Sequence, residues 1–298
     1  MSIDLRQWMM GLDGSKKIFE YTLPGTHDCV TQYVQFAHIS RTQDKNIYNQ
    51  LSLGIRALDI RVEPLEDGKL GMVHGMAKAF NKPGQVNKQM EMIDVLRHVY
   101  RFLKENPSET VIFQFKNDSN KERELCFNNL FYTYIKGCEE KWFLENRVPT
   151  LDEARGKIVL LRRCKMDEEN EEFTDENTGL DFSEWIEQDT EEPDPLPLET
   201  NAKDGAVFVI QDRFKYKPGA RWSECLKPFL DTMKAFDGTY IINYTSTAGG
   251  VKGPRYNSSY INPKFMEYPL DKEKYYGTIY LDFPSRELCE KIIGHNFK

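Results

Sequence analysis

The sequence has few cysteines, and their spacing matches no common metal-binding or redox motif. Cysteine occurs six times in 298 residues, and no two cysteines form a CxxC pair. This spacing excludes a zinc ribbon and a thioredoxin-type redox motif. Cys29 lies two residues after His27, but the fold is what brings a catalytic cysteine and histidine together, so closeness in sequence carries little weight. We expect reduced thiols, some of them buried.

Long apolar runs and an excess of positive charge are also missing. The first 14 residues include Asp4, Arg6 and Asp13, a composition that predicts neither a signal peptide nor a membrane span there. The chain has 40 Lys and Arg against 47 Asp and Glu, a formal net charge of -7. That balance disfavours nucleic acid and strongly anionic bilayers as partners and favours a ligand bound in a pocket. A hydrophobic fraction of 40% is enough for a sizeable core.

Strand-like and helix-like segments alternate along the chain. Strand composition occurs at residues 18–23, 55–62, 70–74, 110–116, 157–163, 206–212, 239–245 and 277–283. Helical spacing occurs at residues 46–53, 90–105, 122–143, 225–236 and 286–293. Eight strands alternating with helices predict a closed α/β barrel of parallel strands. An open doubly wound sheet is the alternative, but no Gly-rich phosphate loop follows the first strand.

One stretch departs from this pattern. Residues 165–204 are acidic and contain prolines, which predicts a solvated loop inserted between two barrel elements. The sequence shows no internal repeat and no linker, so residues 1–298 are expected to form a single domain.

Polar side chains gather near the carboxyl ends of the expected strands. The stretch from Leu23 to Asp28 reads as an apolar run closed by a Pro-Gly turn, with His27 and Asp28 just beyond it. Asp59 and Arg61 are two residues apart and so lie on one face of a strand. The further strand-end residues are His74, Lys116, Arg162, Arg163, Asp212 and Asp282. In a parallel barrel these ends meet at one rim, so we expect a single polar pocket.

Such a pocket suits phosphoryl transfer. Cations stabilise charge on phosphoryl oxygens, and two histidines serve as base and acid on either side of an in-line displacement. A carboxylate fixes the tautomer of each histidine. Metal binding by the same groups is the competing interpretation, but Arg61 places a permanent cation beside Asp59, where a divalent ion would otherwise sit.

Seven stretches together resemble a known family, the X-domain phospholipases C, and in particular its bacterial phosphatidylinositol-specific members. They are residues 23–28, 50–61, 73–75, 156–161, 210–214 and 260–263, with Asp282. The resemblance implies a distorted (β/α)8 TIM-like barrel and cleavage of phosphatidylinositol to diacylglycerol and inositol 1,2-cyclic phosphate, without a metal or other cofactor.

The resemblance also implies roles for particular residues. His27, oriented by Asp282, is the general base for the inositol 2-hydroxyl. Arg61, held by Asp59, takes the place that a calcium ion has in metal-dependent relatives. His74, paired with Asp28, protonates the leaving oxygen. The residues implied to bind inositol are Lys116, Arg163, Asp212 and Phe214.

Two of these assignments involve a choice. Phe214 stands where the bacterial enzymes often have tyrosine, so ring stacking is retained but a phenolic hydrogen bond is not. Arg163 is preferred to Arg162, which is expected to lie outside the pocket. The stretches 244–250 and 254–256 resemble a rim loop near the lipid.

The expected partner is phosphatidylinositol or its glycosylated form at a membrane surface. We expect a monomer with peripheral membrane contact and no nucleic acid. The resemblance implies a secreted protein, whereas the absence of a signal peptide implies a cytoplasmic one if the chain is complete. Two further functions remain open: a metal-dependent glycerophosphodiester phosphodiesterase, and a binding module for inositol phosphates or membranes without catalysis.

Overall fold

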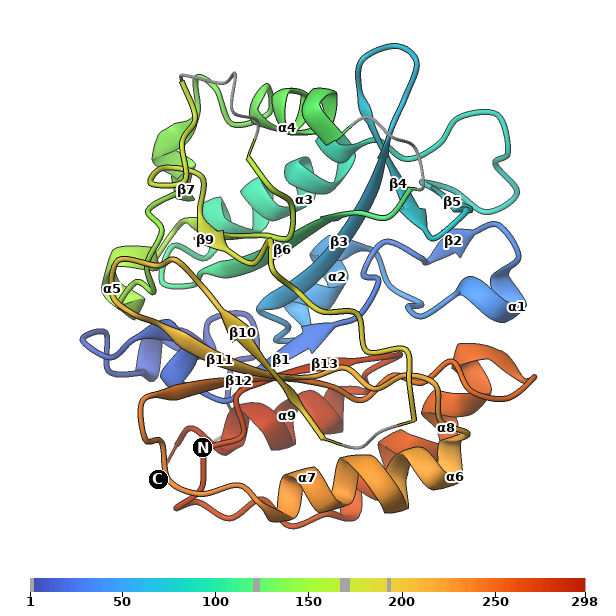
Figure 1. Ribbon diagram of the computed structural model, residues 1–298, viewed down its shortest axis with the longest axis vertical. Helices are drawn as coiled ribbons and strands as arrows, with labels where there is room; N and C mark the ends of the chain where they lie inside the picture. Colours follow the sequence, from blue (N-terminus) through green and yellow to red (C-terminus); the bar gives the residue numbers. More distant parts are fainter. Residues whose placement is uncertain (1–2, 120–123, 167–171, 192–193, 298) are drawn as a thin grey trace.

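The computed structural model describes residues 3–119, 124–166, 172–191 and 194–297. Its centre is a curved sheet with helices on both sides (Figure 1), α3 and α4 on one and α7 and α9 on the other. Parallel pairing joins, in spatial order, β11 (Val207–Gln211), β12 (Thr239–Tyr244), β13 (Thr278–Leu281), β1 (Leu23–Thr26), β3 (Ala57–Pro64), β6 (Val111–Asn117) and β8 (Ile158–Arg162).

Short strands extend this row at both ends. β7 (Trp142–Phe143) and β9 (Leu180–Asp181) pair with β8, and β10 (Leu196–Glu199) runs antiparallel to β11. Within the described residues no strand pairing joins β9 to β10, so hydrogen bonds do not close the barrel there. The prediction of a distorted β/α barrel is confirmed, with this one open side.

Helix α3 (Met92–Glu105) shows how the sequence covers the sheet. It buries Val95, Leu96, Val99 and Phe102, a spacing that puts them on one face of a helix.

The other helices are α1 (Ala37–Ser40), α2 (Ile47–Ser52), α4 (Glu124–Tyr132), α5 (Leu151–Ala154), α6 (Pro218–Ala220), α7 (Lys227–Asp231), α8 (Gly253–Glu267) and α9 (Arg286–Gly294). Short 3-10 turns occupy Trp8–Gly11, Ile18–Glu20 and Glu139–Lys141, and a π-helical turn occupies Arg221–Leu226.

The first predicted strand was misplaced. Residues 18–20 form a 3-10 turn, and the strand is β1, which contains Pro24 and Gly25 instead of ending before them. Gly25 serves close packing here: a Cβ atom on it would lie 2.9 Å from the Tyr280 ring and 3.0 Å from Ala57 Cβ. A glycine inside a strand often marks such a close approach. The strand ends at Thr26, directly before His27, so His27 still lies at the carboxyl end of a strand, as predicted.

The third predicted strand is real but is not part of the parallel row. β4 (Leu70–His74) runs antiparallel to β3 and forms a hairpin with β5 (Ala77–Phe80), which pairs with β2 (Tyr33–Val34). The connection between β3 and β4 is only five residues long, and a parallel crossover needs a dozen or more. The hairpin nevertheless returns His74 to the carboxyl end of the barrel.

The helix predictions need three corrections. The segment predicted at 122–143 is α-helical only as α4; residues 122–123 lie outside the described residues, Glu139–Lys141 is the 3-10 turn, and Trp142–Phe143 is a strand. The segment predicted at 225–236 begins earlier, with α6, and ends at Asp231. Helix α8 was not predicted, and residues 254–256, which resembled part of a rim loop, lie in its first turn. Pro254 fits the first turn, where its missing N–H costs nothing.

The inserted segment is a packed part of the fold and not merely a solvated loop. Leu180, Phe182 and Leu198 from this segment belong to the hydrophobic core, and β9 and β10 flank the open side of the barrel. The acidic residues 167–171 lie outside the described residues. The segment therefore crosses the side of the barrel where strand pairing is missing.

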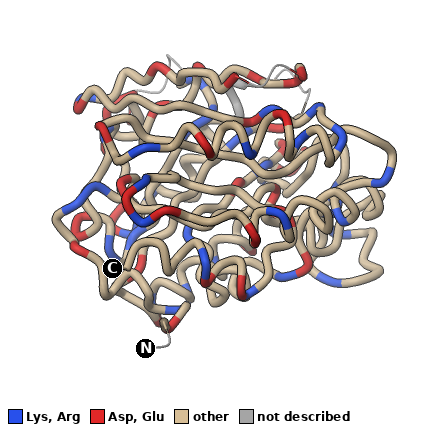
Figure 2. The backbone as a smooth tube through the Cα atoms, turned by 90° about the horizontal axis from the view of Figure 1, so that it is seen from below, with Lys and Arg blue, Asp and Glu red and all other residues tan. Residues whose placement is uncertain are grey.

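Charged residues of both signs are interspersed along the described chain (Figure 2). The two termini lie near each other at the end of the barrel where the parallel strands begin (Figure 1). In the described residues no helix combines the length and apolar character that a membrane span needs.

Candidate active site

The turn after β1 holds His27 and Asp28 in a fixed conformation. Asp28 has a φ of 42°, in the left-handed region that is uncommon for residues with a Cβ atom. Its carbonyl accepts hydrogen bonds from the hydroxyls of Thr31 (3.0 Å) and Thr42 (2.9 Å). The His27 carbonyl accepts one from Gln43 Nε2 (2.8 Å). Backbone strain at a polar turn, held by several side chains, is typical of a functional site.

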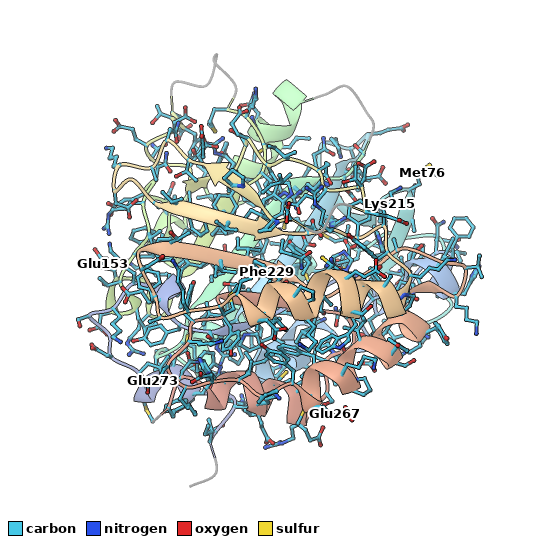
Figure 3. All side chains as sticks on the ribbon, turned by 60° about the horizontal axis from the view of Figure 1, so that its bottom comes forward. Met76, Glu153, Lys215, Phe229, Glu267 and Glu273 are labelled. Carbon is cyan, nitrogen blue, oxygen red and sulfur yellow. The ribbon has the colours of Figure 1, made fainter. Side chains whose placement is uncertain are left out.

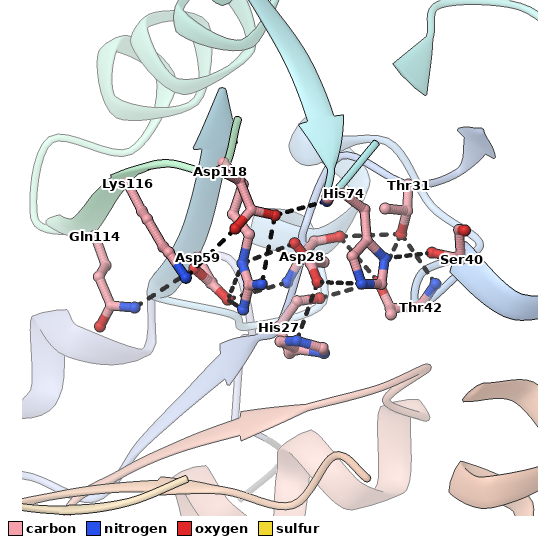
Figure 4. A network of polar contacts seen from close by, with 12 residues as sticks. His27, Asp28, Thr31, Ser40, Thr42, Asp59, His74, Gln114, Lys116 and Asp118 are labelled. Atoms are coloured by element: carbon pink, nitrogen blue, oxygen red, sulfur yellow. Dashed lines mark hydrogen bonds and ion pairs between the residues drawn. The ribbon is translucent and has the colours of Figure 1, made fainter. Parts of the chain in front are cut away.

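Asp28 is the centre of the network (Figure 4). Its Oδ2 lies 3.0 Å from His27 Nε2 and 3.1 Å from His74 Nε2, and its Oδ1 lies 2.9 Å from Arg61 Nε. The carboxylate is completely buried. Burial alone raises its pKa, but Arg61, His74 and His27 outweigh burial and hold the pKa well below the usual range. One carboxylate therefore joins both histidines to the arginine.

The two imidazoles are held on both ring nitrogens. His27 Nδ1 lies 2.8 Å from Asp282 Oδ1, while its Nε2 faces Asp28. Burial lowers the pKa of His27, but Asp28 and Asp282 outweigh it and raise the pKa well above the usual value. His74 Nδ1 lies 2.7 Å from the Ser40 carbonyl. Each of the four ring nitrogens therefore faces an oxygen atom at 3.1 Å or less.

Asp282 follows β13 and is itself positioned by helix α8. Asn262 Nδ2 donates a hydrogen bond to the Asp282 carbonyl at 2.9 Å. Asn262 belongs to residues 260–263, one of the stretches on which the family resemblance rests. The contact gives that stretch a physical role, because it fixes the backbone that carries the partner of His27.

Arg61 projects from β3 between three carboxylates. Its Nη2 lies 3.0 Å from Asp59 Oδ2 and its Nη1 lies 3.7 Å from Asp118 Oδ2, in addition to the contact with Asp28. Burial lowers the pKa of Arg61, but Asp28, Asp59 and Asp118 raise it well above its usual value. His27, Asp28 and Asp59 offer ligand atoms within 4.8 Å of one another, as a metal site would. The Arg61 guanidinium already lies between the two carboxylates, so a metal ion would have to displace it.

A second group of charges lies at the ends of β6 and β8. Lys116 Nζ is 2.7 Å from Glu187 Oε1 and 3.3 Å from Asp118 Oδ1. Arg163 Nη2 is 3.2 Å from the same Glu187 oxygen, and its guanidinium lies 3.8 Å from the centre of the Trp185 ring. Asp118 also accepts a hydrogen bond from the Gly75 amide at 2.6 Å. Asp118 therefore connects this group to Arg61.

A cavity of about 290 Å³ opens above both groups. Of the predicted residues, its lining includes His27, Arg61, His74, Asp212, Phe214 and Asp282. Burial raises the pKa of Asp212 to about 6, with Arg163 partly opposing the shift. Lys116 and Arg163 are not part of this lining, but both contact Glu187, which is. Asp28 and Asp59 lie beneath it and hold the residues that face it.

Arg162 points away from this cavity, as predicted. Its Nη2 lies 2.8 Å from Asp175 Oδ1 and 3.5 Å from Asp181 Oδ1. Its side chain is almost completely buried between β8 and the inserted segment. Successive residues of a strand point to opposite faces, which is why Arg163 points toward Glu187, a residue of the cavity lining, and Arg162 does not.

Sequence reasoning missed Asp118, Glu187 and the Ser40 carbonyl. Asp118 has a local signal, because it follows Lys116 by two residues and so points to the same side of the chain. Glu187 and Ser40 have no such signal. One lies in the inserted segment and the other in helix α1, and only the tertiary fold brings them to the site.

The fold and the site together define a β/α barrel whose cavity is lined by two histidines, an arginine and several carboxyl groups. Residues 16–164, which include β1, β3, β4, β6 and β8, match the family described as phosphatidylinositol-specific phospholipase C, X domain. The chain belongs to this family. The resemblance noted in the sequence is thus confirmed.

Individual relatives match over most of their length. The 1-phosphatidylinositol phosphodiesterase of Listeria monocytogenes is 25% identical over 316 residues, covering 99% of this chain and 86% of the relative. That of Staphylococcus aureus strain Newman is 27% identical over 277 residues, covering 87% and 82%.

Solved structures share the fold from end to end. A phosphatidylinositol-specific phospholipase C from S. aureus superposes with a TM-score of 0.81 at 23% identity, covering 99% of this chain and 98% of that one. The L. monocytogenes structure gives 0.75 at 22% identity, covering 99% and 100%.

Proposed function

We propose that the protein cleaves phosphatidylinositol by attack of the inositol 2-hydroxyl on phosphorus. A new P–O bond forms within the headgroup, the bond to the diacylglycerol oxygen breaks, and inositol 1,2-cyclic phosphate is released. The observation that carries the proposal is the pair of imidazoles on one buried carboxylate, beside an arginine at the floor of the cavity. The hydroxyl is already tethered to the phosphate, so no nucleophile from the protein is required.

His27 is assigned the role of general base. In the free protein its two nitrogens face the Asp28 and Asp282 carboxylates, which raise its pKa, so it must lose a proton before it can accept one from the substrate. The substrate hydroxyl takes the place of Asp28 at Nε2, while the hydrogen bond from Nδ1 to Asp282 keeps the ring in position. The rate is therefore expected to rise as His27 is deprotonated.

His74 is assigned the role of general acid. The contact of Nδ1 with the Ser40 carbonyl fixes the ring, and Asp28 stabilises a proton on Nε2. That proton passes to the diacylglycerol oxygen as the P–O bond breaks. Proton transfer by a positioned side chain of this kind contributes about 10² to 10⁴ in rate.

Arg61 is assigned the stabilisation of charge on the non-bridging oxygens. Its side chain lines the cavity and is held from below by Asp28 and Asp59. A fixed guanidinium matches the geometry of a phosphate and needs no rearrangement during the reaction. These contacts support a reaction in which Arg61 supplies the charge that a metal ion supplies elsewhere.

The mouth of the cavity has the composition of a membrane-binding surface. Phe36, Ile39, Met76 and Val251 are exposed by 62%, 54%, 91% and 95%, and Ile39 and Val251 also line the cavity. Figure 3 shows Met76 and Lys215 at the end of the molecule opposite Glu153 and Glu273. Apolar side chains with cations nearby favour the interface of a bilayer. We therefore place the lipid surface against this mouth.

Vesicle sedimentation tests the membrane contact with two matched variants. Val251→Glu puts a charge at the mouth, whereas Val207→Glu puts the same charge at the start of β11, at the other end of the barrel, where Val207 is 50% exposed. Val251→Glu is expected to weaken binding to phosphatidylinositol-containing vesicles about tenfold. Val207→Glu is expected to bind like the wild type. Equal binding of all three proteins would contradict this placement.

The reaction itself is tested with His27→Asn. Release of water-soluble inositol phosphate from phosphatidylinositol vesicles is expected to fall by about 10⁴-fold, because the base is lost. His98→Asn is the matched control, since His98 lies half-buried on α3 and does not line the cavity. Turnover by His27→Asn at the wild-type rate would refute the assignment.

A further inference from the structure

Tyr244 is buried inside the barrel beneath the site, and its ring packs against His27. It is the last residue of β12, and its side chain is completely buried. The centres of the Tyr244 and His27 rings lie 5.8 Å apart with their planes at 85°, an edge-to-face contact. The Tyr244 ring also stacks on Tyr280, with centres 4.6 Å apart and planes at 11°. Because Tyr280 is itself completely buried, the stack holds the Tyr244 ring against His27.

The Tyr244 hydroxyl is tied to the carboxylate that anchors Arg61. Gln114, on β6, donates from Nε2 to this hydroxyl at 2.5 Å, and the same nitrogen lies 3.4 Å from Asp59 Oδ1. Figure 4 shows Gln114 at the edge of the network, joined to Asp59. The other Asp59 oxygen accepts a hydrogen bond from Arg61 Nη2 at 3.0 Å. One buried amide therefore links the ring that packs against His27 to the carboxylate that holds Arg61.

The hydroxyl and the amide are costly groups to bury at this position. Gln114 is completely buried, and its Oε1 has no hydrogen-bond partner among the residues that the structure describes. Burial and the Asp59 charge raise the pKa of Tyr244 well above its usual value, so its hydroxyl stays protonated. Apolar side chains of similar size would fill the barrel interior without the cost of desolvating two polar groups. Placement of the site above them explains this pair better than stability does.

The proposed reaction leaves the His27 ring with one contact fewer. In the free protein Nε2 faces Asp28 and Nδ1 faces Asp282. Once the substrate hydroxyl has replaced Asp28 at Nε2, the contact of Nδ1 with Asp282 is the remaining ion pair, and the ring can tilt about it. The Tyr244 ring restricts that tilt. This matters because a misplacement of about 1 Å between reacting groups costs about 10²-fold in rate.

We propose that Tyr244 is a positioning residue: anchored by Gln114, its ring keeps the His27 imidazole aligned with a phosphate held by Arg61. The inference rests on the proposed function and adds a residue to its machinery. Tyr244 does not line the cavity, so it acts through His27 and touches neither the substrate nor the reacting atoms.

The test compares two substitutions that each remove one buried hydroxyl and keep the ring. In Tyr244→Phe the kcat for phosphatidylinositol in mixed micelles is expected to fall about tenfold. Its KM should stay within about twofold of the wild type, because the groups that line the cavity are unchanged. Tyr280→Phe is the matched control, since the Tyr280 hydroxyl is buried and has no hydrogen-bond partner in the described part of the chain. Its kcat and KM should equal those of the wild type.

Two results of this comparison would overturn the inference. One is a kcat of Tyr244→Phe equal to that of the wild type. The other is an equal fall of kcat in Tyr244→Phe and Tyr280→Phe, because the loss of any hydroxyl from the barrel interior would then have the same effect. Circular dichroism of each variant confirms that it is folded.

Gln114→Met tests the anchor of the Tyr244 ring. Methionine keeps the length of the side chain but cannot donate to the Tyr244 hydroxyl. Its kcat is expected to fall about tenfold, and the double variant Tyr244→Phe/Gln114→Met should lose no more than either single variant. Losses that multiply in the double variant would contradict the anchoring, because the two side chains would then act separately.

An NMR measurement without turnover separates this inference from the proposed reaction. The Nδ1 proton of His27, hydrogen-bonded to Asp282, gives a downfield signal that is assigned by its loss in His27→Asn. The signal should be sharp in the wild type and in Tyr280→Phe, and broadened by exchange in Tyr244→Phe. If the wild type failed to cleave phosphatidylinositol but this difference appeared, the proposed reaction would fail and the role of Tyr244 would stand. If the lipid were cleaved and all three proteins gave the same signal and the same kcat, the inference would fail alone.

Discussion

Two arginines five residues apart, Arg56 just before β3 and Arg61 within it, have very different surroundings. Arg56 is completely buried just before the strand, and its ion pair is with a single carboxylate, that of Glu109, at 2.6 Å. Its other hydrogen bonds go to the backbone carbonyls of Leu5, Arg6, Leu51 and Ile55. Burial lowers the pKa of Arg56, and Glu109 only partly compensates. The donors of this guanidinium are used within the protein, so its role is to hold the fold together.

Arg61 is surrounded by more negative charge and fewer carbonyls. Three carboxylates approach it, and its side chain lines the cavity. The carboxylates anchor the guanidinium from one side and leave its other side toward the ligand. The comparison teaches that burial and ion pairing alone do not mark a functional arginine. What marks it is an excess of opposite charge at the edge of a cavity.

Of the substitutions that test this comparison, Arg61→Lys is expected to have the largest effect, a loss of activity. A lysine keeps the charge but loses the planar group that reaches Asp59, Asp28 and the phosphate at once. We expect kcat to fall about 10³-fold, as for removal of a fixed donor to a developing charge. Steady-state turnover of phosphatidylinositol checks this, with circular dichroism to confirm folding. Activity within tenfold of the wild type would show that Arg61 resembles Arg56 after all.

Arg56→Lys is expected to show the opposite pattern. The substitution leaves several buried carbonyls and part of the Glu109 carboxylate without their donors, so the free energy of unfolding should fall by about 3 kcal/mol. Turnover at low temperature, where the variant is folded, should stay within about twofold of the wild type. Urea unfolding and a turnover assay on the same sample measure both. A large loss of kcat without loss of stability would break the distinction between the two arginines.

Asp212→Asn is expected to raise the stability of the protein and to lower its activity. Burial raises the pKa of Asp212 to about 6, above the value of about 3.9 expected in an unfolded chain, so the ionised form is less stable in the folded protein. The free-energy cost of ionising Asp212 in the folded protein therefore grows as the pH rises from 4 through 6. At pH 8 the neutral variant should be more stable by about 3 kcal/mol, and the gain should shrink as the pH falls toward 4. Activity should decrease, because an acceptor for a ring hydroxyl is lost.

Of the effects predicted here, the smallest is the one that the protonation of His27 has on stability. Its pKa is raised above the unfolded value, so it contributes stability that is fully present below about pH 6.5 and is lost as the pH rises through the folded-state pKa. His27→Asn should therefore be less stable than the wild type at pH 6, and the difference should decrease by at most about 1.4 kcal/mol per pH unit toward pH 9. Thermal unfolding at the two pH values measures it. A difference that does not change with pH would mean that His27 is not charged in the free protein.

The sequence predicted the site well where a residue lies at the end of a parallel strand. His27, Asp59, Arg61 and Asp282 follow that rule, because strand direction alone brings them to one rim. His74 reached the rim by another route, the antiparallel hairpin of β4. Its position was predicted, but the reason for it was wrong.

The rest depended on tertiary contacts that have no local pattern. Gly25 suggested a turn, whereas the close approach of Tyr280 and Ala57 requires a glycine within the strand. The acidic inserted segment suggested solvent, yet Trp185 and Glu187 from it cover the side of the barrel that strand pairing leaves open. Neither feature follows from periodicity or composition, because each is determined by residues distant in sequence.

Phosphorus NMR of phosphatidylinositol micelles tests the central claim, that His27 and His74 act as base and acid while Arg61 takes the place of a metal. The protein is added once in excess chelator and once with calcium. The account predicts an inositol 1,2-cyclic phosphate signal that grows at the same rate in both samples. A signal that appears only with calcium would contradict it, because a metal ion and not Arg61 would then stabilise the phosphoryl charge.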